Sequence, residues 1–237
     1  MVEQHITSAF DRDLEAVQAQ IMKMGGLVET AIRDSAHALE TRDEEQALSV
    51  RANDKAIDAL EEIINSEAAR VIALRAPTAV DLRVILSVIK IAANLERIGD
   101  YAKNIGKRTV VLSQGGHLTT ESGAALRRMA REVERMLKDA LDAYIQRDVE
   151  LAKDVIERDT DVDQMYNAMF REFLTHMMED ARNITPCMHL HFIAKNIERM
   201  GDHVTAIAEQ VVYVVSGEKP AEDRVKADTT SIKPQEA

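Results

Sequence analysis

The chain has 237 residues, of which 46% are hydrophobic and 30% charged, an ordinary balance for a globular protein with a sizeable core. Its formal net charge of −11 argues against binding to nucleic acid or to anionic lipid, because both need a basic surface. Aromatic residues make up only 3%, and nine glycines and four prolines leave few turns. This composition favours long helices over a sheet.

The single cysteine, Cys187, cannot form an internal disulfide, and without other cysteines it cannot build a thiolate metal site. No stretch approaches the roughly 18 uninterrupted apolar residues of a membrane span, and the N-terminus does not resemble a signal peptide. We therefore expect a cytoplasmic protein.

Apolar residues that recur at steps of three and four residues predict a series of long helices. The first covers about residues 10–39 and contains Gly25-Gly26, which predicts a bend or a close helix crossing. The second follows a break near Arg42-Asp43. The third carries Pro77 in its first turn and reaches about Leu112.

After Gln114-Gly115-Gly116 the pattern begins again, with capping residues at 119–122 and a fourth helix through about Tyr144. A fifth helix is expected over about residues 148–179. Thr185-Pro186 then caps and opens a sixth, which ends near Val215, so Pro77 and Pro186 are expected to play equivalent parts. Residues 216–237 contain two prolines and almost no large apolar residues, which predicts a disordered tail.

An internal repeat divides the chain into two similar halves. The segment from Ile91 to Asp100 recurs from Ile193 to Asp202 with seven of ten positions identical, and the segment from Asp54 to Asp58 has its counterpart at 159–163. Duplication predicts an all-α protein of six long helices, with one three-helix bundle in residues 8–115 and a second in residues 119–215.

Each half carries two pairs of acidic residues spaced four apart, which places both carboxylates of a pair on one helix face. If the helices that carry them pack antiparallel, each half gathers four carboxylates. Oxygen ligands favour Mg²⁺, Mn²⁺ or iron, and zinc is less favoured though possible. The candidate ligands are Asp54, Asp58, Glu96, Asp100, Asp159, Asp163, Glu198 and Asp202.

A charged helix face paired with arginine and lysine is the alternative to a metal site. With 41 acidic residues in the chain, several such pairs arise by chance, and only their equivalent placement in both halves sets these apart. Arg97 and Arg199 either reach across to hold a carboxylate or lie in solvent.

Two further repeated residues flank the acids. Gly99 and Gly201 lie inside helices, where glycine is unfavourable, and so indicate a neighbouring backbone or ligand at close range, or a tight helix crossing. Asn94 and Asn196 are expected to support the carboxylates from outside the ligand shell.

With these motifs the sequence resembles the PhoU family, the regulators of bacterial phosphate uptake, over about residues 10–215. The resemblance rests on Arg75-Ala-Pro77, Asp81-Leu82-Arg83, Glu96-Arg-Ile-Gly-Asp100 with Asn104, Glu198-Arg-Met-Gly-Asp202-His203, and the pairs Asp54/Asp58 and Asp159/Asp163. It implies two three-helix bundles related by a pseudo-twofold axis, with multinuclear metal sites on the eight carboxylates. Ala206 stands where the first repeat has Asn104, so the second site is expected to be weaker or to bind fewer ions.

The resemblance also implies a role. A member of this family would couple the phosphate ABC transporter, through its ATPase subunit, to a sensor histidine kinase, so that ample phosphate silences the starvation response. It would meet the membrane only through these partner proteins. We also expect a homodimer. Such a regulator needs no catalysis, because different affinities for two partner states transmit the signal.

Three other interpretations compete with a metal-dependent regulator. A di-iron oxidase would carry paired Glu-x-x-His motifs, and the nearest approach, Asp34-Ser-Ala-His37, occurs once and has Asp in place of Glu. Hydrolase motifs are also absent from the sequence. A metal-free adaptor that binds the same partners is a third alternative.

Overall fold

Six α-helices build this protein in a computed structural model that describes residues 2–115 and 120–218. Within those residues there is no strand, which confirms the predicted all-α class. The helices are α1 (Val2–Thr41), α2 (Glu44–Arg75), α3 (Ala79–Gln114), α4 (Thr120–Gln146), α5 (Val149–Glu179) and α6 (Ile184–Ser216). No helix in this part of the chain has the length and apolarity needed to cross a bilayer.

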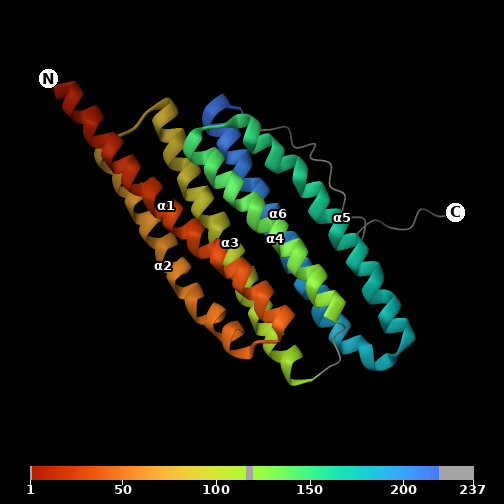
Figure 1. Ribbon diagram of the computed structural model, residues 1–237. Helices are drawn as coiled ribbons and strands as arrows, with labels where there is room; N and C mark the ends of the chain where they lie inside the picture. The colour runs from red at the N-terminus through yellow and green to blue at the C-terminus, as the bar shows by residue number, and fades with distance from the viewer. Residues whose placement is uncertain (1, 116–119, 219–237) are drawn as a thin grey trace.

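The helices form two groups of three that lie side by side, with α1 to α3 in one group and α4 to α6 in the other (Figure 1). The groups meet where α3 packs on α6 and α1 packs on α4. The largest apolar cluster draws buried residues from all six helices, so the two groups share one core. The proposed domain limits of 8–115 and 119–215 therefore stay a prediction.

The turn between α1 and α2 is repeated between α4 and α5. Arg42 and Arg147 adopt left-handed φ angles of 57° and 55°, and the Asp that follows each of them is the N-cap of the next helix. The side chain of Asp43 accepts a hydrogen bond from the Gln46 N–H, and Asp148 caps α5 in the same manner. The duplication seen in the acidic motifs thus extends to the backbone of the turns.

The expectation that Pro77 and Pro186 play equivalent parts is wrong. Helix α2 ends at Arg75, Ala76 takes a left-handed φ of 46°, and Thr78 precedes α3, so Pro77 lies in the connection. Pro186 does lie in the first turn of its helix. The reason is that the Asp180 side chain caps a 3-10 turn that leads directly into α6, whereas the first half reverses through a left-handed residue.

The end of α6 falls close to its predicted position. The helix continues to Ser216 and is capped by Gly217, whose φ of 82° suits glycine. Most of the predicted tail, residues 219–237, lies outside the described residues, as do residues 116–119 between the two halves.

The close crossing expected at the first glycine pair is confirmed. Helix α1 continues through Gly25 and Gly26 without a break. A Cβ on Gly25 would overlap Leu141 Cδ1 of α4, whereas nothing lies within 4 Å of a Cβ on Gly26. Only the first of the two glycines is therefore required by packing.

We expect opposite effects from substituting these neighbours. Gly25→Val should lower the free energy of unfolding by about 1–3 kcal/mol, because it overpacks the contact with the buried Leu141. Gly26→Ala should raise it by about 0.5–1 kcal/mol, because alanine is the better residue in an open helix position. Urea denaturation followed by circular dichroism measures both, and equal effects would contradict the α1–α4 crossing.

Candidate metal centres

The first acidic group lies where α2 crosses α3. Asp54 of α2 is only 3% exposed, and its Oδ2 atom lies 2.5 Å from Lys103 Nζ of α3. The same amine lies 3.2 Å from Asp100 Oδ1, so Lys103 joins carboxylates from two helices. The structure thus brings Asp54 and Asp100 together, as the antiparallel packing of α2 and α3 was expected to do.

Burial shapes the charge of this group. It is the main cause that raises the pKa of Asp54, against the hydrogen bond from Lys103, and the nearby charge of Asp58 raises that pKa further. Burial also raises the pKa of Glu96, with Asp100 as the next cause. The hydrogen bond to Asp54 in turn raises the pKa of Lys103. The four predicted ligands therefore repel one another, and one lysine offsets part of that repulsion.

The second acidic group, between α5 and α6, is more deeply buried. Asp159, Asp163 and Glu198 are each about 4% exposed. Glu198 Oε1 accepts a hydrogen bond of 2.8 Å from Lys195, and burial raises the pKa of Glu198 despite that bond. Asp159 packs against α6 at Gly201, since its Oδ1 would lie 2.9 Å from a Cβ on that residue.

Both motif glycines mark tight helix crossings. A Cβ on Gly99 would lie 3.0 Å from Ile57 Cδ1 of α2, and one on Gly201 would lie 2.9 Å from Asp159 Oδ1 of α5. These distances are shorter than ordinary contacts, so glycine lets the acid-bearing helices approach. Of the alternatives left open by the sequence, the close neighbour is a side chain of the adjacent helix.

Neither Lys103 nor Lys195 is among the predicted site residues. Lys103 follows Asp100 by three residues, whereas Lys195 precedes Glu198 by three, so they are not related by the repeat. A search for identical residues in the two halves passes over them. The spacing of three to an acid on the same helix was the available signal, because such residues are neighbours on the helix surface.

The motif arginines do not reach across the helix pairs. Arg97 lies 3.8 Å from Asp100 on its own helix and is 62% exposed. Arg199 has the same distance to Asp202 and is 53% exposed. Of the two alternatives for these arginines, the structure supports a largely solvated position.

Other motif residues tie helices together. Asn94 Oδ1 lies 2.8 Å from His203 Nδ1, and the Asn94 amide donates to the Lys90 carbonyl, so this side chain joins α3 to α6 rather than supporting a carboxylate. Arg75 pairs with Asp13 at 2.9 Å and holds the end of α2 against α1.

The donor chemistry of both groups fits a cation. One buried carboxylate oxygen in each group, Asp54 Oδ1 and Glu198 Oε2, has no hydrogen-bond partner among the residues that the structure describes. An unsatisfied acceptor of this kind costs about 1–3 kcal/mol. As the side chains stand, no three His, Cys, Asp or Glu within residues 2–115 and 120–218 are grouped so as to hold a metal ion. The lysine amines lie among the carboxylates instead, so a metal ion would replace them.

Both halves of the chain are similar to one known protein family. The family model described as the PhoU domain matches residues 21–109 and again residues 126–211, one match in each half. The chain belongs to the PhoU family. Among the family's proteins, a phosphate-specific transport system accessory protein PhoU homolog of Rhizobium meliloti is 45% identical over 98% of this chain and 97% of its own length. The corresponding protein of Caulobacter vibrioides is 42% identical over 96% of this chain and 99% of its own length.

Solved PhoU structures share this fold. The crystal structure of PhoU from Pseudomonas aeruginosa superposes with a TM-score of 0.85 at 38% identity, covering 88% of this chain and 100% of that one. PhoU from Streptococcus pneumoniae gives a TM-score of 0.82 at 28% identity, covering 90% of this chain and 99% of that one. The predicted fold of two three-helix bundles is therefore confirmed.

Proposed function

We propose that this protein is a negative regulator of phosphate uptake and of the phosphate-starvation response, and that cations bound at its two carboxylate groups take part in that role. The observation that carries the metal part is the same in both halves: a buried carboxylate oxygen without a hydrogen-bond partner beside a lysine amine. The relatives' names as phosphate-transport accessory proteins support the regulatory part.

The proposed partners are the ATPase subunit of the phosphate ABC transporter and the sensor histidine kinase of the phosphate two-component system. The protein would act in the cytoplasm as a homodimer and without catalysis. Preferential binding to one state of either partner suffices for regulation, since a ligand shifts an equilibrium only by its differential affinity.

In the metal-bound form, Asp54, Asp58, Glu96 and Asp100 would hold one centre, and Asp159, Asp163, Glu198 and Asp202 the other. The metal supplies positive charge that neutralises carboxylates which otherwise repel one another. Mg²⁺, Mn²⁺ or iron suits these oxygen ligands best. Binding releases Lys103 and Lys195, so metal occupancy would change the charge that each helix pair presents to solvent.

Elemental analysis of the purified protein, combined with capture of the transporter ATPase and the sensor kinase before and after chelation, tests the proposal. We expect bound metal and a loss of partner binding on chelation. Partner binding that persists without metal would favour the metal-free adaptor and leave the regulatory role standing. Failure to capture either partner with metal present would contradict the regulatory role.

Removing two carboxylates should empty the first centre without unfolding the protein. We expect Glu96→Gln with Asp100→Asn to lower the metal content by the share of that centre and to leave helicity unchanged, because neither residue belongs to the apolar core. Asp11→Asn with Glu15→Gln is the matched control, since this pair has the same spacing on an exposed face. Equal loss of metal from both variants would contradict the assignment.

A further inference from the structure

A pocket of about 180 Å³ lies on the seam between the two halves, where α1 packs on α4. It is distinct from the carboxylate groups, which lie between α2 and α3 and between α5 and α6. Basic side chains dominate its wall. The lining residues are Arg33 and Ala36 of α1 with Arg127, Ala130, Arg131 and Glu134 of α4.

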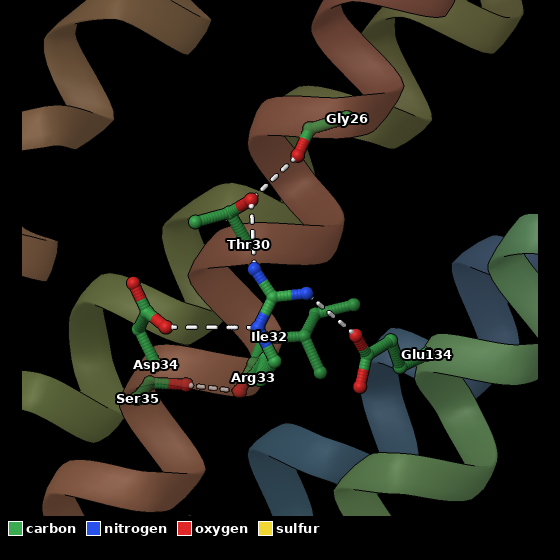
Figure 2. A network of polar contacts seen from close by, with 7 residues as sticks. All are labelled: Gly26, Thr30, Ile32, Arg33, Asp34, Ser35 and Glu134. Atoms are coloured by element: carbon green, nitrogen blue, oxygen red, sulfur yellow. Dashed lines mark hydrogen bonds and ion pairs between the residues drawn. The ribbon is translucent and has the colours of Figure 1, made fainter.

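Arg33 is held in place from both sides of the seam (Figure 2). Its Nη2 donates to Thr30 Oγ1 at 3.2 Å, and its Nη1 donates to Glu134 Oε1 of α4 at 3.2 Å. Thr30 is itself fixed by donating to the Gly26 carbonyl at 2.9 Å. Because these contacts already order the guanidinium, little side-chain entropy is lost when a ligand binds to it.

The two arginines of α4 differ in their partners. Arg127 is paired with Glu40, whereas Arg131 is exposed and has no ion pair within residues 2–115 and 120–218. Three guanidinium groups thus line the pocket. Glu134 and Asp34 pair with Arg33, and Arg131 is the one of the three that has no such partner within the described residues. Ala36 and Ala130 also line the pocket, and their small side chains leave space between the arginines.

We propose that this pocket binds inorganic phosphate. Guanidinium groups match phosphate oxygens in a two-bond fork, and three of them lining one pocket from two helices suit a tetrahedral oxyanion. The pocket, at about 180 Å³, has room for such an anion together with a few waters. The bound anion would join α1 of one half to α4 of the other. Binding here does not depend on the partners or the metals proposed above.

Glu134 provides a test that separates a phosphate site from a structural ion pair. Its carboxylate lies where an anion would approach Arg33, so it competes with the ligand and keeps the affinity modest. Removing its charge should therefore tighten phosphate binding. A purely structural ion pair predicts no such gain, because Glu134→Gln would then only weaken the seam.

Calorimetric titration of the full chain with inorganic phosphate at constant ionic strength tests the site, with circular dichroism to show that each variant is folded. We expect saturable binding that Arg33→Ala with Arg131→Ala weakens about tenfold or more and that Glu134→Gln tightens several-fold. Arg135→Ala is the control: this exposed arginine lies one turn further along α4, outside the pocket, and should leave binding unchanged.

Three results would overturn the proposal. They are no saturable binding of phosphate, equal weakening by Arg135→Ala, and unchanged affinity after Glu134→Gln. A parallel titration with AMP separates the sources of the phosphate group: tighter binding of AMP than of inorganic phosphate would also contradict the assignment to inorganic phosphate.

Discussion

Replacing Lys103 with alanine is expected to destabilise the metal-free protein and to raise its affinity for a divalent cation. The substitution leaves Asp54 buried and without the amine that now lies 2.5 Å from its Oδ2 atom. We expect a loss of about 1–3 kcal/mol in the free energy of unfolding, nearer the lower figure because Lys103 is 42% exposed. Urea denaturation in the presence of a chelator measures this loss.

The gain in metal affinity follows from the same contact. A cation that enters the first centre of the natural protein must displace the lysine, and in the variant nothing opposes it. Calorimetric titration with Mn²⁺ should show tighter binding, and added Mn²⁺ should restore much of the lost stability. Lys107→Ala, an exposed position one turn further along α3, should change neither quantity. A stability loss that metal does not reverse would mean that Lys103 acts only as a structural partner.

Glu198→Gln is expected to stabilise the metal-free protein, unlike Lys103→Ala, and to weaken metal binding at the second centre. Burial raises the pKa of Glu198, so its ionised form opposes folding at neutral pH. An uncharged glutamine keeps the shape and can still accept from Lys195. We expect the free energy of unfolding to rise by about 1 kcal/mol at pH 7, while Mn²⁺ binding at this centre is lost.

The stabilisation by Glu198→Gln should depend on pH. A carboxyl group whose pKa is raised by folding contributes stability that is present below its unfolded value, 4.5, and is lost as the pH rises through the folded value. The advantage of Glu198→Gln should therefore be present at pH 7 and should vanish as the pH falls below 4.5. Denaturation at several pH values measures it, with the exposed Glu157→Gln as control. An advantage that grows toward low pH would contradict the burial of an ionised Glu198.

The helices and the acidic pairs could be predicted from the sequence because both depend on spacing along one helix. Val17, Ile21, Met24 and Val28 recur at helical steps, and all are buried as that pattern requires. The repeat likewise predicted that the two acidic pairs of each half belong together, and Lys103 does join Asp54 to Asp100.

The lysines and the path at Pro77 could not be predicted in the same way. A lysine side chain is long, and whether it turns toward a neighbouring helix depends on the packing of that helix. Arg97 and Arg199 stand out in the sequence because they repeat, yet these side chains lie largely in solvent. Pro77 was misplaced because proline suits both a first helical turn and a connection, and the left-handed Ala76 before it decides between them.

The shared core has a consequence for how this chain arose. A single three-helix half would expose the apolar faces of the helices that now meet as α3 and α6. An ancestral chain of that size would therefore have paired with an identical copy across a true twofold axis, as most homodimers do. Fusion of the two copies removed the requirement for symmetry, and each half could then change alone. Lys103 and Lys195 illustrate such independent change, because they lie on opposite sides of the same repeated motif.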